Sequence, residues 1–316
     1  MKQITDSILM VRPAQFRMNE QTAVNNFFQE QLDMTQDTIT LKAQKEFDDF
    51  VKTLRGVGIK VIVYQDDLIP DTPDSVFPNN WISTHDDGTV VIYPIFAENR
   101  RLERREEEIC GLLDSEGFDI NEIADFTSFE EDGEFEDAGF LEGTGSIILD
   151  RVHEKAYCAL SARADEDLFI YFCEEMEYTP VIFRANQTVD GERKPIYHTN
   201  VMMCVGTDFA VICLDSIDDK KERKNVVKHL KEDGKEIIEI TESQVNRFAG
   251  NMLQVQNKEG KTYLVMSATA LKSLTAEQRS KIERYTTILS SELDTIETCG
   301  GGSARCMIAE VFLPKK

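Results

Sequence analysis

A helix followed by a strand, a loop and a second strand recurs about five times along the sequence, at a period of roughly 60 residues. In the first unit the helix falls at residues 41–54 and the strands at 59–64 and 89–95. The later units begin with helices at 99–113, 165–176, 219–231 and 271–287. Such repetition predicts a closed radial array of α/β units, because closure leaves no free sheet edge. A doubly wound sheet is disfavoured, since it would alternate strands and helices one to one. Residues 1–316 are therefore expected to form a single domain.

The two ends of the sequence are expected to meet in one sheet. Residues 7–12 have the apolar pattern of a strand that Pro13 ends. Residues 306–313 have the β-branched and aromatic pattern of a last strand. Pairing of these two segments would close the array.

The charge of the chain excludes some classes of partner. The 316 residues are 41% hydrophobic, which is enough for a large core, and carry a net charge of -23. This charge repels both nucleic acid and anionic membranes, so we expect neither as a partner. The sequence has no apolar run of membrane-spanning length and no signal-like start, which predicts a cytoplasmic protein. A homodimer is left open.

The cysteines and histidines do not form a metal motif. The seven cysteines are scattered without a C-x-x-C spacing, and the four histidines do not pair at ligand spacing. We therefore expect no metal and no other cofactor.

One stretch interrupts the repeat. Residues 125–137 hold seven acidic residues, no basic residue and three phenylalanines. The stretch is either an exposed acidic loop or a mobile lid, since long loops of this type are often functional.

A glycine-rich turn near the C-terminus precedes a cysteine. Residues 300–302 are three glycines, which let a backbone pass close to a bound molecule, and Cys306 follows at the start of the expected last strand. Cys306 is either a nucleophile or a small buried core residue. Cys299 is the second thiol to consider, in a poorer setting before the glycines.

A cysteine nucleophile needs a histidine that moves protons, and an acid that orients the substrate or the histidine. In a closed radial array the loops of the repeats meet at the centre, so these residues should recur from loop to loop. The candidates are Asp74, Asn79, Asn80, Arg100, Arg101, Glu142, Arg163, His198, Asn200 and Cys306.

Six short motifs in order along the chain resemble one enzyme superfamily. They are Asp-Ser-Val-Phe-Pro-Asn-Asn at 74–80, Asn-Arg-Arg-Leu-Glu at 99–103, Glu-Gly-Thr-Gly at 142–145, Leu-Ser-Ala-Arg at 160–163, His-Thr-Asn at 198–200 and Gly-Gly-Gly-Ser-Ala-Arg-Cys-Met at 300–307. The set resembles the guanidine-modifying superfamily with the five-bladed α/β propeller, or pentein, fold. Its members include arginine deiminase, glycine amidinotransferase and dimethylarginine dimethylaminohydrolase. The first four motifs are similar to those of the dimethylarginine hydrolases, and the last to bacterial amidinotransferase-like proteins of the citrulline-hydrolase group.

The resemblance implies a role for each candidate. A thiolate at Cys306 would attack a planar carbon that bears nitrogen, and His198 would protonate the leaving group and then deprotonate water. Glu142 would hold the N–H groups of the reacting head. The binding residues that complete the implied site are Asp74, Asn79, Asn80 and Asn200 around the head, with Arg163 and either Arg100 or Arg101 on the α-carboxylate of a small amino acid.

Three departures from the motifs bear on the substrate. Asn80, Gly145 and Asn200 stand where family members that bind a guanidinium carry aspartate. Fewer negative charges predict a neutral head, because an asparagine both donates to a ureido oxygen and accepts from its N–H. Citrulline is the neutral relative of arginine, and its hydrolysis gives ornithine, ammonia and carbon dioxide.

Two other readings stay open. An arginine deiminase or amidinotransferase would use the same thiol on a guanidino substrate. A non-catalytic propeller would only bind a partner, although that reading predicts loss of the nucleophile, and Cys306, His198 and Glu142 are all present.

Overall fold

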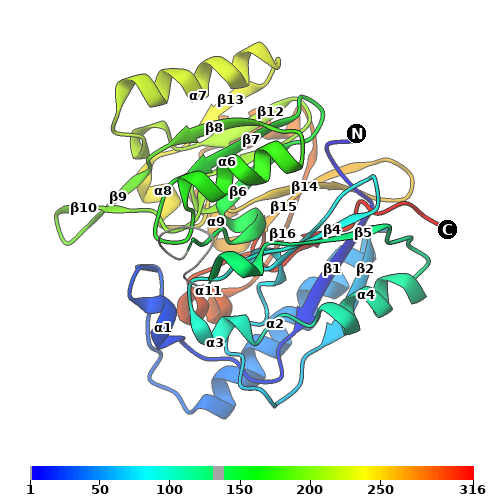
Figure 1. Cartoon of the computed structure of the whole chain (residues 1–316). Coiled ribbons are helices and arrows are strands. Elements are labelled where there is room, and N and C mark those ends of the chain that lie inside the picture. The colour runs from blue at the N-terminus through cyan, green and yellow to red at the C-terminus, as the bar shows by residue number, and fades with distance from the viewer. Residues whose placement is uncertain (1, 131–138) are drawn as a thin grey trace.

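The structure, a computed structural model, describes residues 2–130 and 139–316 and has a mixed α/β fold, as expected (Figure 1). Its described strands form five three-stranded sheets and one hairpin, β9 (Asn186–Val189) with β10 (Glu192–Pro195). In each three-stranded sheet one outer strand is antiparallel to the middle strand and the other is parallel to it. The sheets are β17 (Ala309–Glu310), β1 (Ser7–Arg12) and β2 (Lys60–Gln65); β3 (Ile82–Thr84), β4 (Thr89–Ile92) and β5 (Glu122–Asp125); β6 (Ile147–Asp150), β7 (Lys155–Ala159) and β8 (Thr179–Phe183); β11 (Met203–Val205), β12 (Phe209–Ile212) and β13 (Glu236–Glu239); and β14 (Leu253–Gln256), β15 (Thr262–Ser267) and β16 (Thr287–Ser291).

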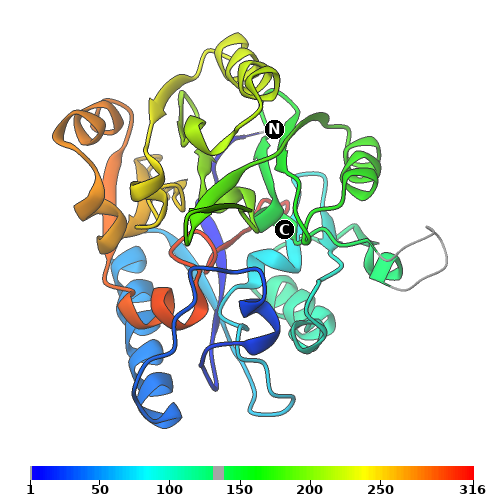
Figure 2. The same cartoon turned by 90° about the vertical axis from the view of Figure 1, so that its left-hand side faces the viewer.

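Helices connect the middle strand of each sheet to its parallel neighbour. They are α2 (Gln36–Gly56), α3 (Glu98–Arg101) with α4 (Glu106–Ser115), α6 (Glu166–Glu175), α7 (Lys220–Glu232), and α9 (Ala268–Ser273) with α10 (Ala276–Glu283). Figure 2 shows these helices at the rim of the molecule and the strands nearer its centre. No helix among the described residues is both long and apolar enough to cross a membrane.

Two of the expected helices are wrong in extent. The helix expected at 99–113 is interrupted between α3 and α4, and the one expected at 271–287 is divided between α9, α10 and the start of β16. The second division has a local cause, because Thr275 forms a capping box with Gln278 and so begins a new helix.

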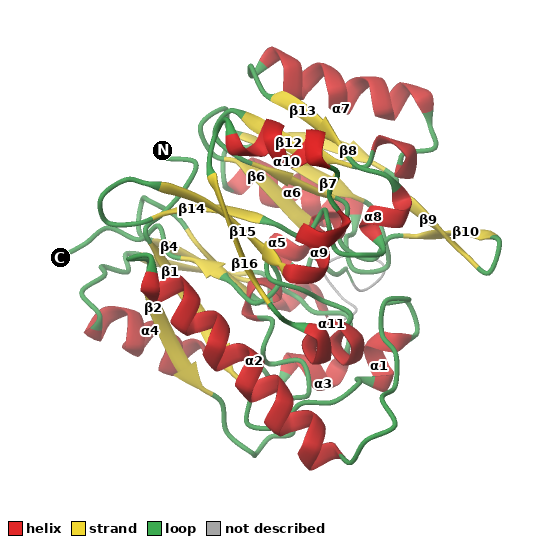
Figure 3. Ribbon diagram, turned by 180° about the vertical axis from the view of Figure 1, so that it is seen from behind, coloured by secondary structure: helices red, strands yellow, loops and turns green. Residues whose placement is uncertain are grey.

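The expected pairing of the two chain ends is confirmed. Leu9 of β1 faces Ala309 of β17 in antiparallel register, while β1 runs parallel to β2 on its other side. The last strand is shorter than expected, since β17 covers Ala309–Glu310 and Cys306 lies in the turn before it. The long helix α2 packs on β1 and β2 (Figure 3) and buries Phe47, Phe50 and Leu54.

Short helical turns lie in the connections between strands. They are α1 (Glu20–Ala23), α5 (Gly143–Ser146), α8 (Glu242–Val245), α11 (Asp294–Gly300), and the 3₁₀ turns η1 (Pro78–Asn80), η2 (Thr127–Glu130), η3 (Thr199–Val201) and η4 (Leu214–Ser216). The α11 turn leads through Gly301, in the left-handed region at φ 61°, toward Cys306. A side chain of α2 holds the other end of α11, because Glu46 accepts N–H groups of Thr295 and Ile296 at 2.8 and 3.0 Å.

Replacing Glu46 by alanine is expected to destabilise the fold by about 1–2 kcal/mol, because the first N–H groups of α11 lose their acceptor and their negative charge. Urea unfolding measures this loss. Asp49→Ala on the same helix is the matched control: Asp49 makes an exposed ion pair with Lys45, and its loss should leave the free energy of unfolding nearly unchanged. Equal losses in the two variants would contradict the capping role of Glu46.

Candidate functional site

The turn that precedes the antiparallel outer strand of each three-stranded sheet carries candidate site residues. These turns hold Asn80 before β3, Glu142 and Gly145 before β6, His198 and Asn200 before β11, Asn251 before β14, and Cys306 before β17. Equivalent positions in the five sheets therefore supply the side chains described below. Asn251 is missing from the sequence-based candidates, although the repeat itself could have indicated it, since every other sheet contributes from the same place.

Glu142 and His198 form a buried, directly bonded pair. Nε2 of His198 lies 2.6 Å from Oε2 of Glu142, and the two side chains are 2% and 0% exposed. Each residue is the N-cap of a short turn, Glu142 of α5 and His198 of η3. The sequence left open whether Glu142 contacts the substrate or the histidine, and in the structure it contacts His198.

Gly145 makes room for this pair. A β-carbon at Gly145 would lie 2.4 Å from Nδ2 of Asn80 and 2.8 Å from Nδ1 of His198, closer than side chains pack. Glycine at this position thus lets Asn80 and His198 approach where the related motif carries aspartate, which would require both side chains to shift.

Burial and two arginines set the charges of the pair. Burial opposes a charged Glu142, but Arg163, His198 and Arg100 outweigh it and lower its pKa to about 2. Burial lowers the pKa of His198 to about 4, although Glu142 favours the cation. At neutral pH a neutral imidazole therefore donates its Nε2 proton to a carboxylate.

Cys306 lies beside the segment that carries His198. Its side chain is buried, and Sγ lies 3.5 Å from Nδ2 of Asn200, two residues after His198. Nδ2 of Asn251 is closer to the sulfur, at 3.2 Å. Burial raises the pKa of the Cys306 thiol, while the backbone of Ser303 and the two carboxamides act in the opposite direction.

Arg100 is buried among acidic and carbonyl groups. It donates to both carboxylate oxygens of Glu103 at 3.0 and 2.9 Å, to Oδ1 of Asn80 at 2.8 Å and to the Phe77 carbonyl. Asp74 and Glu142 lie 3.7 and 3.8 Å from its guanidinium nitrogens. These partners occupy its donors, so the geometry does not fit the expected role of Arg100 in binding a substrate carboxylate.

Arg163 is also buried, and residues 19–29, here called the N-terminal segment, cover it. Its Nε and one terminal nitrogen donate to Oδ1 of Asn25, at 2.9 and 2.5 Å, and it donates to the Thr22 carbonyl. The same segment reaches the glycine-rich turn, where Asn26 and Gln29 donate to the Gly300 carbonyl. Figure 1 shows α1 of this segment near α3 and α11.

Two expected residues stand apart from this cluster. Arg101 donates to the Ile95 carbonyl and lies 3.4 Å from Glu130. The Asn79 side chain is fully buried, and neither its oxygen nor its nitrogen has a hydrogen-bond partner among the described residues. The role of Asn79 in binding a ligand stays a prediction, and the contacts of Arg101 are with Ile95 and Glu130.

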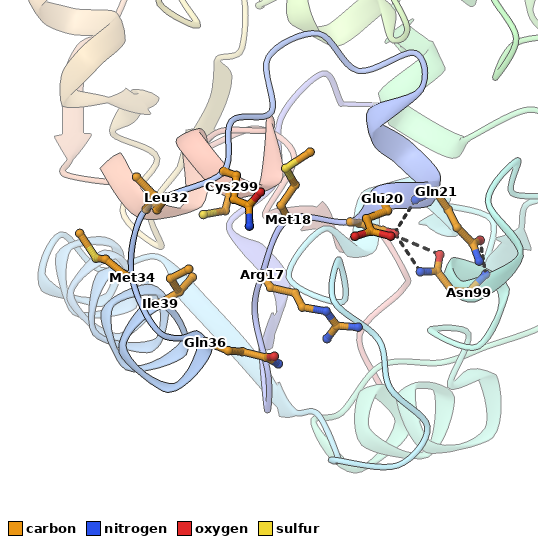
Figure 4. A pocket seen from close by; sticks show the side chains of 12 residues that line it. Arg17, Met18, Glu20, Gln21, Leu32, Met34, Gln36, Ile39, Asn99 and Cys299 are labelled. Carbon is orange, nitrogen blue, oxygen red and sulfur yellow. Dashed lines mark hydrogen bonds between the residues drawn. The ribbon is translucent and has the colours of Figure 1, made fainter.

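Cys299 lines a different hollow. A pocket of about 620 Å³ lies between the N-terminal segment, α2 and α11, and Figure 4 shows Cys299, Arg17, Glu20 and Asn99 on its walls. Its lining contains no histidine among the described residues. Burial raises the pKa of the Cys299 thiol, as it does for Cys306, so the choice between the two thiols stays a prediction.

The acidic stretch at 125–137 is described only in part, because residues 131–137 lie outside the described residues. Phe126 and Phe129 are buried, and Glu130 pairs with Arg104 and Arg101. The first part of the stretch is thus anchored, and its role as a lid stays a prediction.

One group of described residues has ligand atoms close enough for a metal ion. Ligand atoms of Asp150, His153 and Asp233 lie within 4.8 Å of one another. Lys235 lies 3.1 Å from Asp150, and Lys155 bonds to both oxygens of Asp233 at 2.7 and 2.8 Å. The two lysines already balance both carboxylates, so this group reads as an ion-pair network.

Acidification should test the buried neutral state of His198. Because its pKa falls from 6.5 to about 4 on folding, its contribution to stability is complete above pH 6.5 and is lost as the pH falls toward 4. The gap corresponds to about 3 kcal/mol. Urea unfolding at about pH 7 and pH 4 should show this extra loss in the wild type and not in His198→Gln, which keeps a donor for Glu142. An equal loss in both proteins would contradict a buried neutral imidazole.

Comparisons with known proteins give the same superfamily. A family model described as "N,N dimethylarginine dimethylhydrolase, eukaryotic" matches residues 12–313. A comparison of the sequence with curated proteins gives no match. The fold is similar to that of ArgZ, an arginine dihydrolase from the ornithine–ammonia cycle in cyanobacteria, with a TM-score of 0.72, 16% identity, and coverage of 98% of this chain and 41% of ArgZ. The chain therefore spans about two-fifths of the length of that relative.

Two smaller structures match over nearly their whole length. The N-terminal domain of ArgZ bound to product has a TM-score of 0.70 and 17% identity, with coverage of 98% of this chain and 99% of that one. A dimethylarginine dimethylaminohydrolase variant in an adduct with S-methyl-L-thiocitrulline has a TM-score of 0.64 and 14% identity, with coverage of 98% and 100%. The family match over residues 12–313 shows that the chain belongs to the N,N-dimethylarginine dimethylhydrolase family of the guanidine-modifying pentein superfamily.

Proposed function

We propose that the protein is a cysteine-dependent hydrolase that cleaves C–N bonds of a small ureido or guanidino amino acid. The observation that carries the proposal is the Glu142–His198 pair, joined through the 198–200 segment to Asn200 and the Cys306 sulfur. Family membership supports a hydrolase of the guanidino type.

The proposed reaction proceeds through a covalent intermediate. Sγ of Cys306 attacks the planar carbon of the head, the bond to the terminal nitrogen breaks, and the thiol proton leaves with ammonia by way of His198. Water, activated by His198, then cleaves the thiocarbamate, restores the thiol and releases a carbamic acid, which decomposes to an amine and carbon dioxide. Glu142 keeps the imidazole oriented through both steps. In a related case, an ArgZ N-terminal domain variant is covalently bound to a reaction intermediate.

We infer that the head is neutral, from the orientation of one carboxamide. A guanidinium only donates, so the 2.8 Å bond from Arg100 requires Oδ1 of Asn80 on that side. Nδ2 of Asn80 therefore faces His198 and Gly145, where it is buried without a partner among the described residues. A ureido oxygen can accept from this N–H, whereas a guanidinium has no acceptor to offer. An unmade bond at a buried donor costs about 1–3 kcal/mol. Citrulline, hydrolysed to ornithine, ammonia and carbon dioxide, is the proposed substrate.

Arginine is the second candidate, as in the neighbour ArgZ. Oδ1 of Asp74 is a buried acceptor without a partner among the described residues, and it would suit the N–H groups of either head. A deiminase or amidinotransferase would use the same residues on this substrate. A non-catalytic binding role has no feature of the site in its favour.

We propose that the substrate carboxylate binds Arg163 in place of Asn25. The oxygen of Asn25 takes two N–H groups of Arg163 in the manner of a carboxylate. Because Glu142, His198 and Cys306 are all buried, entry of a substrate requires the N-terminal segment to move.

We also propose that the five sheets are the blades of a closed propeller around this site. Neighbouring outer strands support it, since β17 contacts β3, β6 contacts β11, and β11 contacts β14. The ring continues where the N–H of Gln256, in β14, donates to the Thr5 carbonyl next to β1.

Purified protein incubated separately with citrulline and arginine should release ornithine and ammonia from citrulline. Cys306→Ser should lower the rate by about a thousandfold or more, because serine is far less acidic as a nucleophile. Cys299→Ser is the matched control and should keep the rate. Turnover of arginine but not citrulline would overturn the neutral-head proposal, and full activity of Cys306→Ser would overturn the nucleophile.

Replacing Asn80 by aspartate should change the substrate preference. The variant loses the N–H that faces the head and gains a negative charge, so the ratio of kcat/KM for citrulline to that for arginine should fall by about tenfold or more. Steady-state kinetics on both substrates measure this ratio. An unchanged ratio would show that Asn80 does not read the head.

A further inference from the structure

Asn251 approaches the Cys306 sulfur more closely than any other side-chain donor described. Its Nδ2 lies 3.2 Å from Sγ, compared with 3.5 Å for Nδ2 of Asn200. Asn251 is fully buried and lies in the turn before β14, and the activity proposed above gives it no role.

Backbone groups determine which way the Asn251 carboxamide points. The N–H of Arg305 donates to its Oδ1 at 3.0 Å, and a backbone N–H cannot accept. Nδ2 must therefore face the other way, where it reaches both Sγ and the Asn200 carbonyl, the latter at 3.0 Å. For Asn200 both ends of the carboxamide lie near Sγ, with its oxygen at 3.8 Å, so its orientation is less restricted.

The chain around Asn251 is built for this close approach. A β-carbon at Gly250 would lie 2.3 Å from the Val201 carbonyl oxygen, so glycine allows the turn to pack directly against the segment that carries Asn200. The Asn251 side-chain amide is fixed at both ends, because its oxygen accepts from Arg305 and its nitrogen donates to the Asn200 carbonyl. Among the described residues, the acceptors near its N–H groups are the Asn200 carbonyl and the Cys306 sulfur.

We propose that Asn251 is the thiolate-binding residue of the site: its N–H stabilises negative charge on Cys306 before attack and when the thiol is released. This inference rests on the proposed function, because it takes Cys306 as the nucleophile. Hydrogen bonds to a charged group are roughly twice as strong as neutral ones, so the donor favours the thiolate over the thiol. Asparagine suits this place, whereas an aspartate there would repel the anion.

The test is the titration of the Cys306 thiol, which needs no substrate. The thiolate ultraviolet absorbance of the full chain is followed against pH, and the curve of Cys306→Ser is subtracted to remove the other cysteines. Asn251→Leu, of similar size without a donor, should move the midpoint upward by about one pH unit or more. The rate with citrulline at neutral pH should fall by about tenfold, and the loss should shrink as the pH rises past the new midpoint.

Asn257→Leu is the matched control, since Asn257 directly follows β14, whereas Asn251 precedes it, and bonds to the Val57 carbonyl rather than to sulfur. It should leave the titration unchanged. An unmoved midpoint in Asn251→Leu, or an equal shift in the control, would overturn the proposal. Asn251→Ser, which is smaller and less disruptive to packing, repeats the titration if the leucine variant does not fold. Failure of the proposed hydrolase would appear separately, as no turnover in a wild type whose Asn251 variants still shift the titration.

Discussion

The candidate site depends on a network of carboxylates and arginines that are buried away from water and paired with one another. Glu142, Glu103 and Asp74 are buried with Arg100 and Arg163, and such groups are tolerated only where each charge has close partners. Glu142 alone touches Arg163, Arg100 and His198, and Asp74 accepts from Asn19 and Thr22 of the N-terminal segment. Removing one of these arginines or carboxylates would leave the opposite buried charges with fewer partners, so the network acts as one unit. The network joins turns from separate sheets to the N-terminal segment that covers them. It therefore holds residues that are far apart in sequence at fixed positions relative to one another.

Sequence predicted the elements whose signal is local. The apolar face of α2, the strand at 7–12 and its pairing with the last strand all follow from period and composition, and the structure confirms them. The short strands β3 and β5 were not predicted, because three or four residues show too little periodicity and β5 is largely exposed. The division of two helices was not predicted, because capping residues such as Thr275 interrupt an otherwise helical pattern.

The candidate site was readable from sequence where residue types are distinctive, and less so where geometry decides. Cys306, His198 and Glu142 were found by type and motif, and two of them make a direct contact. Arg100 and Arg101 look alike in sequence, but one is enclosed by Glu103 and Asn80 and the other turns to Glu130. Asn251 carries no motif, and only its equivalence to the other pre-strand turns marks it. Contacts between distant segments decide which groups surround Arg100 and which end of the Asn251 amide faces the Cys306 sulfur. No local sequence pattern contains that information.

The pairing of β1 with β17 links the placement of Cys306 to the order in which the chain is synthesised. β1 is synthesised early, but the turn with Cys306 is held between α11 and a strand that pairs with β1 at residues 309–310. Until those residues leave the ribosome, the first sheet lacks one strand, and the turn with Cys306 lacks the pairing that holds it in place. The Cys306 sulfur can therefore be held beside the carboxamides of Asn200 and Asn251 only once residues 309–310 have been made.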